Sequence, residues 1–222
     1  MRRASPFTLA VALALSGAAR EASAQSVAVT ARMQRFFFRG ALGVGYGTFT
    51  SSTSVGALSM HGAGAMGNFA IGVNLIRGLA VHVDACAMSL VTPVVSVNGV
   101  DRTSVSNADA TTTTSIIGGG LTWSDRGGLL WVSVTGGVAV LGVEIPAVMM
   151  TSTGVTTPTF GLTQLGWGVN VLAGHDWPIV YNWRIGLALH GIFTQVPDQP
   201  FMGSTPVWEN FGGGLSLTVS DR

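Results

Sequence analysis

Few side chains in this chain can do chemistry, and two of them stand close together in the run "LAVHVDACAM". His82 and Asp84 fall on one face of an extended segment, because side chains alternate along a strand. A hydrolase would need a serine converging on such a pair, and none is evidently poised near it. His61 and His175 are isolated, and the spacing of metal ligands is absent. The sequence therefore predicts no catalytic residue, no metal site and no cofactor.

Arg39, Arg184 and His190 share the strand face predicted for His82 and Asp84. Charged groups inside a low-dielectric wall need partners. One hypothesis is therefore a polar plug that holds the fold closed. The other is a proton-sensitive or ligand-sensitive gate, because imidazole titrates near neutral pH. Both hypotheses require a fold that brings these five side chains together.

The composition indicates a membrane protein. Only 9% of the residues are charged, against about 25% in an ordinary soluble domain. A water-soluble protein so poor in charge would struggle to cover its surface, and a chain that is 47% hydrophobic is not disordered. The formal net charge of +1 offers no basic surface for nucleic acid. The single cysteine, Cys86, excludes an internal disulfide.

The N-terminus carries the pattern of a secretory signal peptide. Arg2 and Arg3 precede an apolar stretch at 7–19, and Ala22-Ser23-Ala24 fits a cleavage signal. The predicted organisation is a signal peptide at 1–24, a short segment at 25–35 and a single domain at 36–222.

Membrane-spanning helices fit the remaining sequence poorly. A helical span needs about 20 consecutive apolar residues. The apolar run from Leu129 to Val143 ends at Glu144, and the stretch 69–90 is interrupted by charge. Both are rich in Val, Thr and Gly, which favour strands or turns over helices.

Period-two alternation instead predicts eight strands, and their connections alternate in length. The strands cover residues 36–49, 64–76, 79–92, 113–124, 129–143, 161–175, 183–194 and 208–219. Short connections lie at 77–78, 125–128 and 176–182, and long Ser/Thr-rich ones at 50–62, 93–112, 144–160 and 195–207. A sheet can cross lipid only when it closes and leaves no unpaired edge. The predicted fold is all-β, a transmembrane antiparallel eight-stranded up-and-down β-barrel.

Side-chain parity supports the barrel over its alternative, a soluble β-sandwich. In "GALGVGYGTF", Leu42, Val44 and Tyr46 share one face, and Ala41 and glycines occupy the other. Aromatic residues also gather in two bands, as expected at the two membrane interfaces. The band near the long loops contains Tyr46, Trp167, Phe193, Trp208 and Phe211, and the band near the short turns contains Trp123, Trp177 and Trp183. Trp131 has inward parity, for which the sequence offers no reason.

In an eight-stranded ring the third and seventh strands lie on opposite walls. Asp84 and Arg184 are therefore expected to approach each other across the lumen. The long loops carry Asp101, Asp109, Glu144, Asp198 and, at the rim, Glu209, against Arg102 alone. This acidic crown is interpreted as ordinary solvated loops or as a surface for cations or a partner.

With the strands placed, the chain resembles small outer-membrane barrels of the OmpA-transmembrane-domain, OmpX and OmpW type. "GALGVGYG" is similar to their Gly- and aromatic-rich first strand, and "ENFGGGLSLTV" to their closing strand. The resemblance implies a location in the cell outer membrane and contact with its lipid and with the barrel-insertion machinery. Family members commonly end in an aromatic residue, whereas this chain ends Val219-Ser220-Asp221-Arg222.

Three hypotheses for function follow from these observations. The first is a structural or surface-interaction barrel whose loops meet an extracellular partner. The second is a small pore, or a binding or passage barrel, for a small and apolar molecule. The third, less favoured, is an enzyme that modifies membrane lipid.

Overall fold

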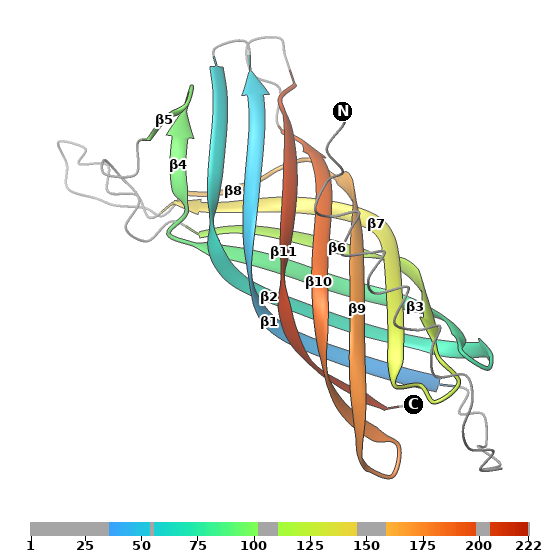
Figure 1. Cartoon of the computed structure of the whole chain (residues 1–222). Helices are drawn as coiled ribbons and strands as arrows, with labels where there is room; N and C mark the ends of the chain where they lie inside the picture. The colour runs from blue at the N-terminus through green and yellow to red at the C-terminus, as the bar shows by residue number, and fades with distance from the viewer. Residues whose placement is uncertain (1–35, 54–55, 102–110, 146–158, 199–204, 222) are drawn as a thin grey trace, which may run out of the picture. The chain divides into compact units, whose positions relative to one another are not determined.

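The computed structural model describes residues 36–53, 56–101, 111–145, 159–198 and 205–221, and every regular element within them is a β-strand. The strands are coloured in chain order in Figure 1. They are β1 (Phe36–Thr53), β2 (Gly56–Ile76), β3 (Leu79–Val91), β4 (Val94–Val97), β5 (Val100–Asp101), β6 (Thr111–Ser124), β7 (Leu130–Ile145), β8 (Thr159–Leu162), β9 (Gly166–Val180), β10 (Trp183–Pro197) and β11 (Val207–Asp221). No helix in these ranges is long and apolar enough to span a membrane.

Eight of these strands close into a ring. β1 pairs antiparallel with β2 on one side and with the last strand, β11, on the other. The path continues through β3, β6, β7, β9 and β10, each antiparallel to its neighbours. Both edges of the sheet are thereby paired, which is the closure that a barrel requires. The predicted eight-stranded antiparallel barrel is confirmed.

The strands of the ring are strongly tilted. Following paired residues once around the barrel from Ile185 leads back to β10 at Gln195, ten residues further along. Such a stagger is the geometric condition for closing a sheet into a barrel. An interior of eight strands is just wide enough for side chains to fill. Inward residues from all sides therefore meet one another.

Each predicted segment corresponds to one ring strand, but the connections predicted at 50–62 and 176–182 were too long. Residues 50–62 were expected to form a long loop, whereas β1 continues to Thr53 and β2 begins at Gly56, paired with it. Ser and Thr are compatible with strands, so a polar composition did not mark the end of pairing. The connection 176–182 is also shorter than expected, because β9 runs on to Val180.

Short strands extend the ring at the ends of β2 and β7. After β3 the chain forms β4, which pairs with Leu58–His61 of β2 (Figure 1). β4 turns into β5 through Asn98 and Gly99, whose φ angles of 52° and 77° suit a tight hairpin. β8 pairs with the end of β7, so the predicted strand 161–175 is divided into β8 and β9.

Alternation of side chains gives the barrel an apolar outer surface. Leu42 is 75% exposed and Leu189 is 68% exposed, on strands whose alternate residues are buried. The outward residues of the ring are mainly Leu, Val, Ile and aromatic residues. Such a surface is unfavourable in water and typical of a barrel that faces hydrocarbon.

The lumen is filled in two layers. Toward the long-loop end, an apolar cluster is formed by Phe49, Met60, Met66, Cys86, Met88, Leu90, Ile116, Ala139, Leu141, Ile192, Val196 and Trp208. Toward the short turns, the buried side chains are mainly polar or charged.

The glycines of the first strand make room for the apolar layer. A Cβ atom at Gly45 would lie 2.5 Å from Sδ of Met66 and 2.6 Å from the carbonyl oxygen of Gly213. One at Gly47 would collide with Met88. Flexible methionine side chains therefore occupy the space that glycine leaves in a narrow interior.

Candidate functional site

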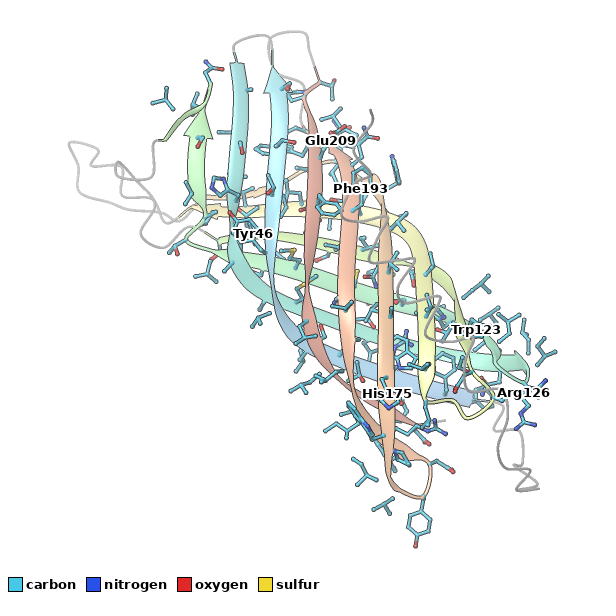
Figure 2. The ribbon with its side chains drawn as sticks, in the orientation of Figure 1. Tyr46, Trp123, Arg126, His175, Phe193 and Glu209 are labelled. Carbon is cyan, nitrogen blue, oxygen red and sulfur yellow. The ribbon has the colours of Figure 1, made fainter. Side chains whose placement is uncertain are left out.

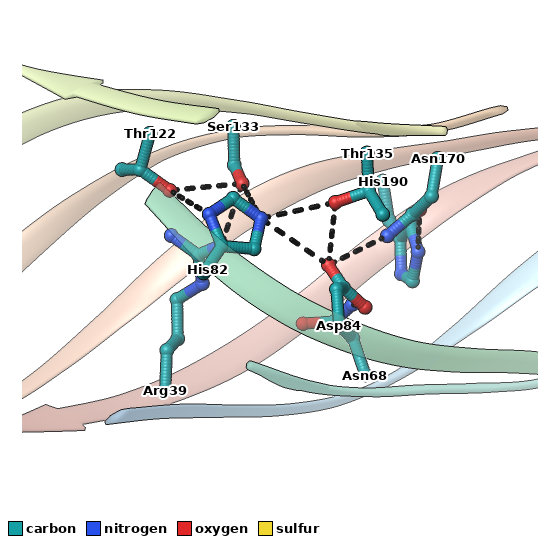
Figure 3. Close-up of polar contacts among 9 residues, drawn as sticks. All are labelled: Arg39, Asn68, His82, Asp84, Thr122, Ser133, Thr135, Asn170 and His190. Atoms are coloured by element: carbon teal, nitrogen blue, oxygen red, sulfur yellow. Dashed lines mark hydrogen bonds and ion pairs between the residues drawn. The ribbon is translucent and has the colours of Figure 1, made fainter. Parts of the chain in front are cut away.

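Buried polar side chains form a continuous network in the half of the lumen near the short turns (Figure 3). We call it the lumen network. Every ring strand contributes to it. Its members are Arg39 of β1, Asn68 of β2, His82 and Asp84 of β3, Thr122 of β6, Ser133 and Thr135 of β7, Asn170 of β9, His190 of β10 and Ser216 of β11.

Asp84 is the anionic centre of the lumen network and is 1% exposed. Its carboxylate accepts hydrogen bonds from Asn68 Nδ2, from the Thr135 hydroxyl at 2.9 Å and from Asn170 Nδ2 at 3.4 Å. A carboxylate that enters a low-dielectric interior loses its hydration, and charge-assisted hydrogen bonds are the strongest available compensation. These hydrogen bonds tie β3 to its neighbour β2 and, across the lumen, to β7 and β9.

His82 connects this anion to the rest of the network. Its Nε2 lies 3.0 Å from Thr135 Oγ1 and 3.8 Å from the Asp84 carboxylate. Because Thr135 donates its only hydroxyl hydrogen to Asp84, its oxygen accepts from His82, so Nε2 of the imidazole carries a hydrogen. Thr122 Oγ1 lies 3.4 Å from the other ring nitrogen.

Arg39 is the cationic centre of the network and is fully buried. Its Nη2 donates to Ser133 Oγ at 2.8 Å, and its guanidinium lies over the Trp131 ring. Arg39 and Asp84 are therefore linked through three intermediate side chains. Ser133 lies 3.4 Å from His82, His82 lies 3.0 Å from Thr135, and Thr135 lies 2.9 Å from Asp84. The two opposite charges are joined by hydroxyl and imidazole groups.

His190 extends the network to the opposite wall. Asn170 directs its amide nitrogen to Asp84, so its carbonyl oxygen faces His190 Nε2 at 2.7 Å and accepts a hydrogen bond from it. Ser216 Oγ lies 3.4 Å from Nδ1 of the same ring. Both ring nitrogens therefore have partners.

Arg184 does not join the lumen network. Its guanidinium donates to the carbonyl oxygens of Gly127, at 3.2 Å, and Gly128, in the turn between β6 and β7. The expected approach of Arg184 to Asp84 is therefore wrong. Both residues have inward parity, but Arg184 is the second residue of β10 and lies at the turn end of the barrel. Of the five predicted lumen residues, the structure brings together Arg39, His82, Asp84 and His190.

The fold also brings Ser133, which the sequence did not place there, to the predicted His–Asp pair. Ser133 Oγ lies 3.4 Å from His82 Nε2, which is also the nitrogen that faces Asp84. A Ser-His-Asp triad needs the serine and the acid on opposite ring nitrogens. Ser133 is also only 1% exposed. This geometry differs from that of a hydrolase. Among the residues with described positions, no group of three His, Cys, Asp or Glu side chains suits a metal ion.

Asp176 is a buried acid that was expected in the short connection 176–182. It lies within β9, is fully buried and accepts hydrogen bonds from Thr218 at 3.0 Å and Ser220 at 2.9 Å. Its even number continues the inward parity of Asn170 in the same strand. That parity was the signal that predicted an inward Asp176. Pro178 indicated instead that the strand ended before it, so Asp176 was placed in the connection.

The aromatic residues predicted for the two bands lie on the outer surface, apart from one residue. Figure 2 shows Tyr46 and Phe193 toward one end of the barrel and Trp123 toward the other. Trp167, Phe211, Trp177 and Trp183 are also exposed outward. Trp208 was wrongly assigned to the band: it is 7% exposed in the apolar cluster, and its indole nitrogen donates to Asp198 at 2.9 Å.

The acidic crown lies largely outside the described residues. Asp109 and Arg102 belong to that undescribed part, as do the side chains of Asp101 and Glu144. Glu209 is at the rim, where its carboxylate accepts a hydrogen bond from Gln195 at 3.3 Å, and Gln195 in turn accepts one from Trp167 at 3.0 Å.

The chain is similar to solved outer-membrane proteins. Neisserial surface protein A is 15% identical, with a TM-score of 0.46 over 84% of this chain and 96% of that chain. The outer-membrane protease OmpT of Escherichia coli is 10% identical, with a TM-score of 0.43 over 86% of this chain and 97% of that chain. The outer-membrane protein AlkL is 13% identical, with a TM-score of 0.44 over 90% of this chain and 95% of that chain. No family model and no curated protein matches the chain.

Proposed function

We propose that the chain is an outer-membrane barrel with a closed lumen, and that its role is structural or surface-interacting at the long-loop end. The outer surface supports the membrane location, since its exposed side chains are mainly apolar and are bounded by two aromatic bands. The interior supports the absence of a pore, since side chains fill it in two layers. On this proposal the lumen network acts as a plug.

The observation that carries the proposal is the sequence of layers along the lumen. An ion that entered from the short turns would meet the buried Arg39 and Asp84, whose side chains already hydrogen-bond to Ser133 and Thr135 of the lumen network. Beyond them it would meet the apolar cluster, in which Met88 and Leu90 are fully buried. Moving an ion through such a region without water is strongly unfavourable.

Planar-bilayer conductance of the refolded full chain tests the closed lumen. We expect no reproducible channels at neutral pH, and heat-modifiable gel migration of the same sample will show that the barrel is folded. Reproducible channels from a heat-modifiable sample would overturn the plug. A polypeptide that dissolves as a compact monomer without detergent would overturn the membrane location.

A second candidate is passage of a small apolar molecule, and the methionines of the apolar layer favour it. Met66 and Met88 lie against glycines of β1 and β11, and methionine is a flexible side chain that can change rotamer. The test is uptake of a small alkane-like dye into liposomes that carry the protein. Faster uptake with M66A/M88A than with the parent chain would support passage. Passage would be excluded if the variant and the parent chain both gave the uptake rate of protein-free liposomes.

A further inference from the structure

Two short turns of the barrel are packed against each other. The amide of Ser124, the last residue of β6, donates to the carbonyl oxygen of Gly78 at 2.8 Å, so the start of the β6–β7 turn lies beside the β2–β3 turn. Gly78 has a φ of 83°, and a Cβ atom there would lie 2.6 Å from the Ser124 carbonyl oxygen. Glycine at position 78 is therefore needed for both the turn conformation and the contact.

Three guanidinium groups gather around the β6–β7 turn. Arg77, from the neighbouring turn, donates through Nη2 to the carbonyl oxygen of Arg126 at 3.4 Å. Arg126 itself is exposed, and Arg184 donates to the next two carbonyl oxygens of the turn. A Cβ atom at Gly128 would lie 2.8 Å from Arg184 Nη1, so the glycine admits that side chain. We call Arg77, Arg126 and Arg184 the turn arginine cluster.

The positive charge of this cluster is not neutralised by the part of the chain that the structure describes. The protein groups that Arg77 and Arg184 contact are carbonyl oxygens, and none of the three guanidinium groups forms an ion pair with a carboxylate there. Asp125 is the acid of the turn. Its Oδ1 accepts hydrogen bonds from the amides of Leu129 and Leu130, at 2.7 and 3.3 Å. The carboxylate of this turn is therefore bound to backbone amides, and the three cations around the turn bind carbonyl oxygens or are exposed.

Apolar surface borders the cluster directly. Ile76 precedes Arg77 and is 59% exposed, and Trp123 is 53% exposed shortly before Arg126. Figure 2 shows Trp123 and Arg126 at the same end of the barrel. The arrangement places cations immediately beside an aromatic band that meets the membrane interface. A phospholipid has the matching chemistry, because its anionic phosphate is joined to two hydrocarbon chains.

We propose that the turn arginine cluster binds the phosphate of an anionic phospholipid in the leaflet that the short turns reach. Guanidinium groups form bidentate, charge-assisted hydrogen bonds with phosphate. The acyl chains of the same lipid then pack against Trp123 and Ile76. This inference rests on the proposed function, because it requires the barrel to stand in a membrane.

Retained lipid tests the proposal. The full chain is refolded in micelles that contain equal amounts of phosphatidylglycerol and phosphatidylcholine, and bound lipid is counted by native mass spectrometry. We expect enrichment of phosphatidylglycerol on the parent chain and a loss of about tenfold in R77Q/R126Q. R77K/R126K keeps the charge and should keep most of the enrichment. Y181S is the control, because Tyr181 is exposed in the turn between β9 and β10, and it should not change the enrichment of phosphatidylglycerol.

Two further arms separate the possible failures. R126Q alone is included because, within the described residues, no hydrogen bond of the Arg126 side chain holds the fold. This variant therefore reports binding even if the double variant does not fold. Heat-modifiable variants that keep the full phosphatidylglycerol preference would overturn the inference and leave the proposed function intact. Displacement of the lipid by millimolar inorganic phosphate would overturn the lipid as the ligand. A parent chain that never becomes heat-modifiable would overturn the proposed function.

Discussion

The guanidinium carbon of Arg39 lies 4.0 Å from the centre of the Trp131 ring, inside the barrel. Both side chains are almost completely buried, on β1 and β7. A cation held over an indole face in a desolvated site is stabilised by about 2 kcal/mol or more. This contact supplies the reason for the inward parity of Trp131, which the sequence left unexplained.

Replacing Trp131 with leucine should lower the free energy of unfolding by about 3–5 kcal/mol, through the cavity and through the lost contact with Arg39. The measurement is a urea titration of the protein folded in lipid vesicles. W123L is the matched control, because Trp123 faces outward, and its cost should be well below that of W131L. Equal costs for the two variants would show that Arg39 gains nothing from Trp131.

Replacing Asp84 with alanine should destabilise the barrel by about 3–5 kcal/mol, because the buried cation Arg39 loses the anion of its network. Asn68, Thr135 and Asn170 would also lose their acceptor. D84N keeps the shape and one acceptor oxygen, so its cost should be smaller. Thermal unfolding and bilayer conductance are the measurements. If D84A changed neither, the lumen network would be neither plug nor gate.

The cost of replacing a β1 glycine with alanine should depend on whether that glycine faces the lumen or the outside. A Cβ atom at Gly43 would lie 2.6 Å from the Cα of Ser216 and would collide with the Leu215 carbonyl oxygen, whereas one at Gly40 meets nothing within 4 Å. We therefore expect G43A to cost about 1–3 kcal/mol of unfolding free energy and G40A to be tolerated. Urea titrations of the two variants provide the comparison. A G43A barrel as stable as G40A would contradict the packing described for this strand.

The side of the wall on which each residue lies was largely predictable, because a barrel imposes a period of two on all its strands. His82, Asp84 and His190 were placed inward on that basis alone, and all are buried. Which inward residues meet was not predictable. Contacts across the lumen depend on the tilt of the strands and on how far the register advances around the ring, and neither leaves a mark in the parity. Arg184 and Asp84 share a parity and lie at different levels.

Position along the barrel axis and parity also have to be read together. Trp208 lies at the level of the aromatic band near the long loops, and it was assigned to that band for this reason. Its even number gives it the parity of the inward Asn210 on the same strand, and the side chain is in the lumen. Ser133 shows the converse limit: its inward parity was evident, but its proximity to His82 comes from the register in which β3 pairs with β6 and β6 with β7.

Cys86 provides a native probe of lumen closure, because its thiol is buried in the apolar cluster beside the polar layer. A water-soluble maleimide can reach it only when the barrel opens locally. We therefore expect alkylation of the folded protein in vesicles to be more than about 100-fold slower than alkylation in urea. Mass spectrometry of timed samples measures both rates, and C86S serves as the unreactive control. Rapid labelling of heat-modifiable protein would mean that water reaches the middle of the lumen, which the two filled layers forbid.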